Sequence, residues 1–116
     1  MCHVLIIEDE FFIAEFMAWM VEECGADSTS IACSETQALS CAREEQPGLI
    51  VSDVNLGWGG NGPDAVASIR DEYGDIPVIF VTATPEECAN CDYAAAILDK
   101  PVQPERFAAA IKSLCG

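Results

Sequence analysis

Four short apolar runs in this chain of 116 residues each end in a polar signature, and this pattern constrains the fold most. The runs are residues 4–7, 48–52, 77–81 and 96–98, and the polar residues that follow or close them include Glu8, Asp9, Asp53, Thr82 and Lys100. Between the runs, apolar residues recur at helical spacing. Strict alternation of strand and helix with short connections is typical of a parallel sheet covered on both faces. We therefore predict an α/β domain with a doubly wound parallel sheet.

Glycine, proline and cap residues set the limits of the predicted elements. Gly25 ends the first helix, and Pro85 opens a short fourth helix at a position that proline tolerates. Ser34 with Gln37 resembles a capping box before the second helix. The predicted strands are residues 4–7, 27–33, 48–53, 77–81 and 95–98, and the predicted helices are residues 12–25, 34–46, 63–73, 85–93 and 104–114. Because no linker or repeat interrupts this series, we expect residues 1–116 to form one domain.

The chain is strongly acidic, with 20 Asp and Glu residues against five Lys and Arg and a net charge of −15. Binding to nucleic acid depends on Lys and Arg side chains that neutralise phosphates, so we expect no nucleic-acid partner. No apolar run approaches the ~20 residues that a membrane-spanning helix needs, so we expect no membrane association. The N-terminus enters a strand without a basic segment or a cleavage site, and we therefore predict a cytoplasmic protein.

Seven cysteines raise the alternatives of a disulfide framework and a zinc site. Their number is odd and the predicted compartment is reducing, which disfavours disulfides. Only Cys88 and Cys91 have the spacing of metal ligands, and one such pair is weak support for zinc. Cys2 and His3 would lie at the far end of the first strand. We expect most of the cysteines to be buried thiols and keep a redox-active Cys88–Cys91 pair as the alternative.

The polar residues at the strand ends should converge, because the carboxyl ends of parallel strands meet at one edge of a sheet. Glu8, Asp9 and Asp53 would share one pocket, where carboxylates repel one another unless a cation lies between them. Oxygen donors suit Mg²⁺, which also takes phosphate oxygens. An aspartate can attack phosphorus to give an acyl phosphate, while Thr82 and Lys100 could hold phosphoryl oxygens. We therefore predict a site that binds a divalent cation and transfers a phosphoryl group.

Taken together, four motifs resemble the signature of the receiver domains of bacterial two-component response regulators. The motifs are Ile6-Ile7-Glu8-Asp9-Glu10, Ser52-Asp53-Val54-Asn55, Val81-Thr82-Ala83 and Asp99-Lys100-Pro101. The resemblance covers essentially the whole chain and implies a flavodoxin-like (βα)5 fold with strand order 2-1-3-4-5. It implies a stand-alone receiver in a two-component or phosphorelay pathway. It also implies a cis bond between Lys100 and Pro101, which proline makes accessible.

The resemblance implies a role for each residue at the strand ends. Asp53 would accept a phosphoryl group from a phosphohistidine of a sensor histidine kinase or a histidine phosphotransfer protein. Thr82 and Lys100 would hold the phosphoryl oxygens. The implied ligands of Mg²⁺ are Asp9 directly, Glu8 chiefly through water, Asp53, and Asn55 through its backbone carbonyl. The phosphorylated state would then change partner binding.

The chain departs from the receiver pattern at three places. Ile97 stands where the family usually has an aromatic residue, so we expect only a modest rearrangement there on phosphorylation. Only 17 residues separate Thr82 from Lys100, which predicts that the fourth helix is short or irregular. After Asp53, a glycine-rich loop begins at Gly57 and could gate access to the acceptor, although a merely longer turn is an equal alternative.

The first predicted helix offers a docking surface. Its predicted inward stripe consists of Phe12, Ile13, Phe16, Met17 and Met20, and its outward residues include Phe11, Ala14, Ala18 and Trp19. Exposed aromatic side chains on one face indicate a contact site. The resemblance implies that the face with Phe11, Ala18 and Trp19 docks the phosphodonor, and incidental exposure is the alternative.

Other functions compete with a signalling receiver. The chain could serve as a phosphate sink or as an intermediate in a relay. A small aspartyl-phosphate phosphatase of similar topology would need a second aspartate two residues after the nucleophile, where this chain has Asn55. A binding module that is not phosphorylated, or a redox protein using Cys88 and Cys91, is the third alternative. We expect no enzyme beyond a domain that catalyses its own phosphorylation and dephosphorylation.

Overall fold

A single parallel sheet of five strands organises the protein. The computed structural model describes residues 2–88 and 91–115. The strands are β1 (His3–Ile7), β2 (Ser28–Ala32), β3 (Leu49–Ser52), β4 (Val78–Thr82) and β5 (Ala96–Asp99). Their order is β2-β1-β3-β4-β5, and every neighbouring pair is parallel. The predicted doubly wound sheet and its strand order are confirmed.

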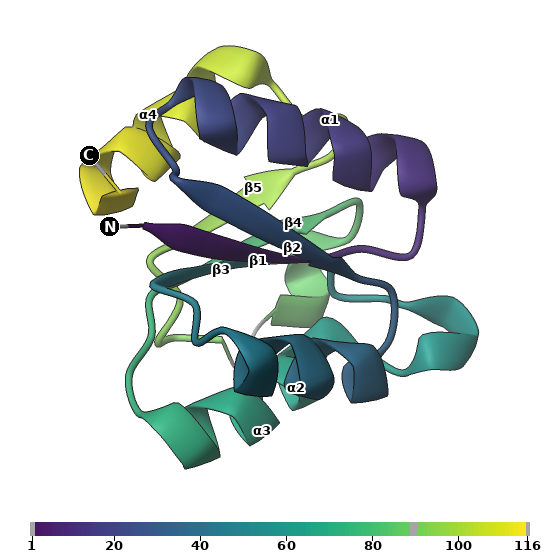
Figure 1. Ribbon diagram of the computed structural model, residues 1–116. Coiled ribbons are helices and arrows are strands. Elements are labelled where there is room, and N and C mark those ends of the chain that lie inside the picture. Colours follow the sequence, from purple (N-terminus) through teal and green to yellow (C-terminus); the bar gives the residue numbers. More distant parts are fainter. Residues whose placement is uncertain (1, 89–90, 116) are drawn as a thin grey trace.

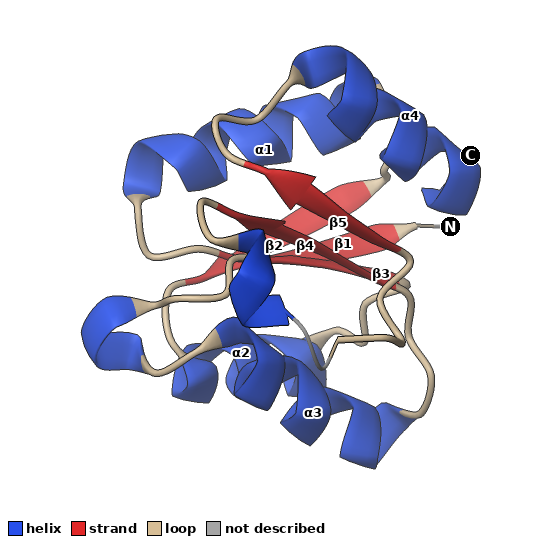
Figure 2. Ribbon diagram, turned by 180° about the vertical axis from the view of Figure 1, so that it is seen from behind, coloured by secondary structure: helices blue, strands red, loops and turns tan. Residues whose placement is uncertain are grey.

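Four α-helices cover the two faces of the sheet. They are α1 (Phe11–Glu23), α2 (Glu35–Glu44), α3 (Gly62–Tyr73) and α4 (Pro104–Cys115). Helices α1 and α4 lie on one face, and α2 and α3 lie on the other (Figures 1 and 2). Each pair closes its own apolar core, because alternate strand residues point to opposite faces. The central strands β1, β3 and β4 are buried throughout, as expected for a sheet covered on both sides.

The connection between β4 and β5 contains a short 3₁₀ turn, η2 (Pro85–Cys88). This turn lies on the same side of the sheet as α2 and α3 (Figure 2). The prediction of a short or irregular fourth helix is therefore confirmed for the described residues. The expected helix over residues 85–93 includes Ala89 and Asn90, which lie outside the described residues.

Side-chain caps begin two of the helices. The Ser34 hydroxyl accepts a hydrogen bond from the backbone N–H of Gln37 at 3.1 Å, as the predicted capping box requires. The Gln37 amide oxygen accepts from the N–H of Cys33 at 2.8 Å. At the start of α3, the Asn61 side chain accepts from the N–H of Asp64 at 2.8 Å. These contacts satisfy N–H groups that a helix leaves free at its start.

The buried face of α1 differs from the predicted stripe. Phe12 and Phe16 were expected to point inward, but they are 85% and 41% exposed. Ala14 and Ala18 were expected to point outward, yet both are buried together with Met17. Alanine side chains let the helix backbone approach the sheet closely, whereas phenylalanine rings would hold it away. Because almost every position of α1 is apolar, hydrophobic spacing alone could not identify its inner face.

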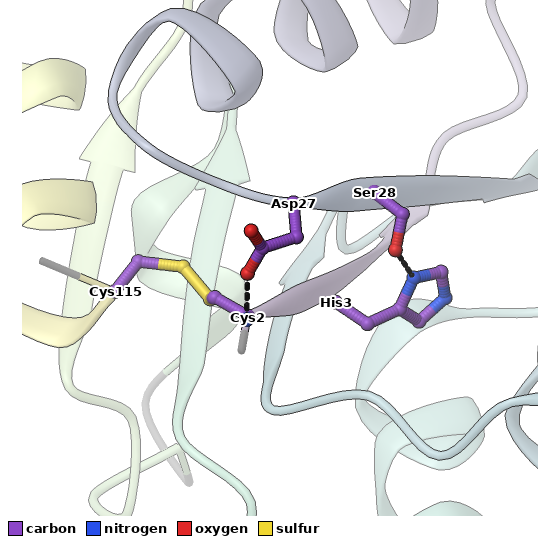
Figure 3. The surroundings of a disulfide bond; sticks show 5 residues. All are labelled: Cys2, His3, Asp27, Ser28 and Cys115. Carbon is purple, nitrogen blue, oxygen red and sulfur yellow. Dashed lines mark hydrogen bonds between the residues drawn. A yellow bond between two sulfur atoms is a disulfide. The ribbon is translucent and has the colours of Figure 1, made fainter.

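A disulfide joins Cys2, just before β1, to Cys115, the last residue of α4 (Figure 3). The expectation that disulfides are disfavoured is wrong for this pair. The sheet places the start of β1 and the end of α4 at the same edge, and the two Cα atoms lie 5.8 Å apart, a normal separation for a disulfide. Five cysteines are free. Of these, Cys88 and Cys91 are buried thiols as predicted.

His3 lies at the same edge as the disulfide and far along β1 from its carboxyl end. Its ring nitrogens hydrogen-bond the hydroxyls of Ser28 and Ser30 at 2.7 and 2.9 Å. The backbone N–H of Cys2 donates to the Asp27 carboxylate at 2.6 Å (Figure 3). These contacts tie β1 to the edge strand β2. In the described part of the chain, no helix has the length and apolar character needed to cross a bilayer.

Candidate functional site

The predicted site residues lie at the carboxyl edge of the sheet. Glu8 and Asp9 follow β1, Asp53 follows β3, Thr82 ends β4, and Lys100 follows β5. These four strands are adjacent in the sheet, so their ends converge. They border a cavity of about 350 Å³ whose lining includes Asp9, Asp53, Asn55, Thr82, Glu87 and Lys100. Glu8 does not line this cavity, but its carboxylate contacts Lys100, which does.

Three carboxylates form the acidic part of the site. Glu8, Asp9 and Asp53 each offer an oxygen, and these oxygens all lie within 4.8 Å of one another. Glu8 and Asp53 are buried, whereas Asp9 is exposed at the mouth. A donor set made only of carboxylate oxygens, open on one side to water, fits a hard divalent cation such as Mg²⁺. The residues that could hold a metal are therefore present together.

Lys100 bridges two of these carboxylates. Its Nζ donates to Glu8 Oε1 at 2.7 Å and to Asp53 Oδ2 at 2.9 Å. The backbone N–H of Lys100 donates to the Thr82 carbonyl at 2.9 Å, which continues the pairing of β4 with β5. The following Lys100–Pro101 bond is cis, as the resemblance implied. The lysine ammonium therefore lies against the Asp53 carboxylate.

Burial and hydrogen bonds shift the pKa values of two groups in this cluster, Glu8 and Lys100. Desolvation, with a smaller contribution from the charge of Asp53, raises the pKa of Glu8 to about 7, although Lys100 and the N–H of Glu10 oppose the rise. Burial alone would lower the pKa of Lys100, but its hydrogen bonds to Glu8 and Asp53 outweigh that effect and the pKa is raised. The lysine therefore stays charged at neutral pH, while Glu8 is partly protonated.

Thr82 and its neighbour Thr84 form a pair on the cavity wall. Thr82 is buried, and its Oγ1 accepts from the N–H of Thr84 at 3.0 Å. The two hydroxyls lie 3.3 Å apart. The sequence reasoning singled out Thr82 but missed Thr84. The recurrence of threonine two residues after the end of a strand was the available signal, since such hydroxyls often bond the backbone of a turn.

Asn55 lies at the rim of the cavity in the turn after Asp53. Its side-chain oxygen accepts from the N–H of Gly57 at 2.8 Å, so the side chain shapes the turn. Asn55 also pairs with Asn61 in an isolated antiparallel bridge. The predicted use of the Asn55 backbone carbonyl as a ligand stays a prediction.

Gly62 packs against the backbone of Asp53 and was missed by the sequence reasoning. A Cβ at this position would overlap the backbone carbonyl oxygen of Asp53. The N–H of Gly62 donates to the Val54 carbonyl at 2.8 Å, and the Ser52 hydroxyl donates to the Asp53 carbonyl at 2.8 Å. The N–H of Val54 donates to Asp53 Oδ1 at 2.7 Å. The start of α3 therefore packs directly against the backbone of Asp53, and this close approach requires glycine.

The outer face of α1 carries an aromatic surface. Phe11 and Trp19 are 66% and 60% exposed, as predicted. Ala18 is buried and does not belong to this face. Phe12 and Phe16 replace it, and the ring of Phe16 stacks on Trp19 with 6.5 Å between centroids. We call Phe11, Phe12, Phe16 and Trp19 the α1 aromatic face.

Comparison with known proteins connects this geometry to characterised domains. The family model described as "Response regulator receiver domain" matches residues 4–112. The phyllosphere-induced regulator PhyR of Methylorubrum extorquens is 38% identical over 111 residues, which cover 93% of this chain and 41% of that protein. The chain therefore spans less than half the length of this relative.

Solved structures agree in fold. The receiver domain of the Erythrobacter litoralis PhyR response regulator superposes with a TM-score of 0.87 at 35% identity, covering 97% of this chain and 88% of that one. The anti-anti-sigma factor PhyR of Bartonella quintana superposes with a TM-score of 0.83 at 34% identity, covering 97% of this chain and 46% of that one.

Proposed function

Because the chain belongs to the family of response regulator receiver domains, we propose that it accepts a phosphoryl group on Asp53. The donor is a phosphohistidine on a sensor histidine kinase or a histidine phosphotransfer protein. Residues 1–116 act as one receiver domain in the cytoplasm, and the phosphorylated state changes the binding of a protein partner. The domain assists its own phosphorylation and dephosphorylation and has no separate substrate.

The contact between Lys100 and Asp53 is the observation that carries this proposal. An ammonium 2.9 Å from the acceptor carboxylate can transfer its hydrogen bond to a phosphoryl oxygen once that oxygen arrives. Thr82 lines the same cavity and can donate its hydroxyl to a second phosphoryl oxygen. Together the Lys100 ammonium and the Thr82 hydroxyl would stabilise the negative charge on the phosphoryl oxygens during the transfer.

The reaction is a transfer from nitrogen to oxygen. An Asp53 carboxylate oxygen attacks phosphorus, a P–O bond forms, and the P–N bond breaks with its electron pair passing to the imidazole nitrogen of the donor. Asp9, Asp53 and Glu8 would hold Mg²⁺, with the Asn55 carbonyl as a further ligand. When bound, the cation reduces the repulsion between the carboxylate and the incoming phosphoryl oxygens. Glu8 would give up its proton to take part.

The α1 aromatic face supports docking of the phosphodonor. It lies on the helix that starts three residues after Glu8, so a protein bound there would reach the acceptor cavity. Large exposed apolar side chains gathered on one helix face are uncommon unless they are covered by a partner. The acidic character of the chain disfavours nucleic acid as that partner.

The test is phosphorylation by a small phosphodonor. Acetyl phosphate with Mg²⁺ should add one phosphoryl group to the wild-type chain, seen by intact mass, and chelation should prevent it. Asp53→Asn should abolish the gain, while the exposed-site control Asp71→Asn should retain it. A phosphoryl group that persists in Asp53→Asn would contradict the proposal.

The relatives named above suggest the kind of output. One of them is named an anti-anti-sigma factor, and we propose that this chain likewise signals by binding a protein partner. A phosphate sink or relay intermediate is the alternative. Rapid loss of the phosphoryl group to a histidine phosphotransfer protein, without binding of any other partner, would favour that alternative.

A further inference from the structure

Trp58 is the most exposed large apolar side chain among the described residues, with a relative accessibility of 107%. It occupies the middle of the 3₁₀ turn η1 (Gly57–Gly59), in the connection from β3 to α3. An indole left wholly in water gains nothing from the hydrophobic effect, whereas burial by a partner would remove a large apolar area.

Backbone hydrogen bonds hold the turn that presents Trp58. The N–H of Gly59 donates to the Leu56 carbonyl at 3.0 Å, and the N–H of Leu56 donates to the Gly60 carbonyl at 3.1 Å. Leu56 itself is buried under the turn with 2% exposure. The exposed indole of Trp58 therefore lies two residues after Leu56, whose side chain anchors the same turn in the core.

The base of the turn packs against the start of α2. A Cβ at Gly59 would lie 2.8 Å from the Cys33 carbonyl oxygen, so this contact requires glycine. The N–H of Asn61 donates to Glu35 at 2.9 Å. Because the turn is held at both its tip and its base, the backbone of Trp58 is fixed in place, which lowers the entropy that binding would cost.

The turn adjoins the acceptor cavity. Gly57 lines the cavity that contains Asp53, and a Cβ at Gly57 would lie 3.5 Å from Asp9 Oδ2. Trp58 is the next residue and projects outward from this rim. A protein that brings a phosphohistidine to Asp53 has to cover the mouth of the cavity that Gly57 lines, whereas a small phosphodonor need not touch the turn.

We propose that Trp58 determines recognition of the protein phosphodonor. This inference rests on the proposed function, since it assumes transfer to Asp53. The partner surface is an apolar pocket bordered by Lys or Arg side chains. The pocket covers the indole, and the basic border matches both a chain of net charge −15 and the ring face, which attracts cations.

The experiment compares two donors on the full chain. The autophosphorylated kinase domains of the source organism are screened as a panel, and the one that labels the wild-type chain fastest is used on variants. Phosphoramidate, a small donor with a P–N bond, serves in parallel. The variants are Trp58→Ala, Trp58→Phe and Ile31→Ala, the last being an exposed apolar control on β2.

Trp58→Ala should lower kcat/KM for the kinase by about tenfold or more, mainly through KM, as expected for an aromatic hot spot. Trp58→Phe should recover part of this loss, and Ile31→Ala should match wild type. Labelling by phosphoramidate should be the same for all four proteins. Equal transfer from the kinase to Trp58→Ala would overturn the inference, and so would a panel in which no kinase labels the wild type.

Two further results would also overturn it. Slower labelling of Trp58→Ala by both donors would place the effect in the acceptor site rather than in docking. A wild-type dimer that Trp58→Ala dissociates would show that a second copy covers the indole. Failure of the proposed function itself looks different, because phosphoramidate would then leave the wild-type chain unlabelled at Asp53.

Discussion

Breaking the disulfide between Cys2 and Cys115 should destabilise the domain strongly, because the bond closes almost the whole chain into a ring. The two cysteines are 113 positions apart. For a closed loop of this size, the chain-entropy relation gives roughly 5 kcal/mol of stabilisation at 25 °C as an upper value, and native disulfides typically deliver about 2–4 kcal/mol. For a domain of this length, about 3 kcal/mol corresponds to a fall in Tm of roughly 10–15 °C.

Thermal unfolding by circular dichroism, with and without a phosphine reductant, measures this effect. Cys115→Ser should melt like the reduced wild type, and reductant should not lower its Tm further. The exposed free cysteine provides the control, since Cys33→Ser should keep the full response to reductant. Alkylation of the unfolded, non-reduced chain should modify only the five free cysteines. If the verified oxidised protein and Cys115→Ser melt within about 2 °C of each other, the loop-entropy reasoning is refuted.

Four further predictions concern the acceptor site. Without a divalent cation, Glu8 has a folded-state pKa of about 7 against an ordinary value of 4.5, so the folded protein binds this proton more tightly. The protonated Glu8 therefore stabilises the fold fully below pH 4.5, and this contribution to the free energy of unfolding, up to roughly 3 kcal/mol, is lost as the pH rises through about 7. Urea unfolding measured as a function of pH should show this loss for the wild type, and Glu8→Gln should remove it. Gly62→Ala should lower the free energy of unfolding by more than about 3 kcal/mol, or prevent folding, because its Cβ would overlap the Asp53 carbonyl. The control Gly48→Ala should be tolerated, since its Cβ would lie 3.9 Å from the nearest atom, and equal urea midpoints for the two variants would disprove the clash. Asp9→Ala should weaken Mg²⁺ binding roughly tenfold or more in calorimetry, and unchanged affinity would remove Asp9 from the ligand set. On addition of a phosphoryl mimic, the changes in backbone amide NMR chemical shift should be small at Ile97 and larger in residues 57–62. The reverse pattern would show that the signal does not pass through the loop of residues 57–62.

Much of the fold follows from short-range features of the chain. Apolar runs of four residues such as Val4–Ile7 and Val78–Val81 lie in strands buried on both faces, where continuous apolar character is required. Cap residues act locally, and Ser34 begins α2 as its spacing to Gln37 indicated. These signals depend only on neighbours in sequence, so they can be read without knowing the packing.

Features that depend on distant contacts were not predictable in the same way. The inner face of α1 is decided by how closely the helix can approach the sheet, which favours Ala14 and Ala18 over Phe12. The disulfide depends on two chain ends meeting across the fold, and cysteine spacing carries no information about that. Gly62 looked like part of a glycine-rich loop because its neighbour, the Asp53 carbonyl, lies nine positions earlier in the chain.

The residues of the predicted acceptor site were easier to predict than these features, because the order of the strands alone brings their side chains to one edge of the sheet. Once β1, β3, β4 and β5 lie side by side, residues that follow them must share one edge. The pKa of Glu8 was less accessible, since it depends on complete burial beside Lys100 and Asp53. Sequence places charges near one another, but only packing determines how much water they lose.

Lys100, which pairs with both Glu8 and Asp53, determines the net charge of the carboxylate cluster. With all groups ionised, three carboxylates and one ammonium leave two negative charges in the cluster. A divalent cation cancels this excess, a monovalent one leaves a negative charge behind, and a trivalent one overshoots, so valence alone favours an ion such as Mg²⁺. Replacing the carboxylate of Asp53 by an acyl phosphate dianion then adds one negative charge that neither Lys100 nor the divalent cation balances. In physical terms, the signal that this domain would send is the appearance of that one unbalanced charge.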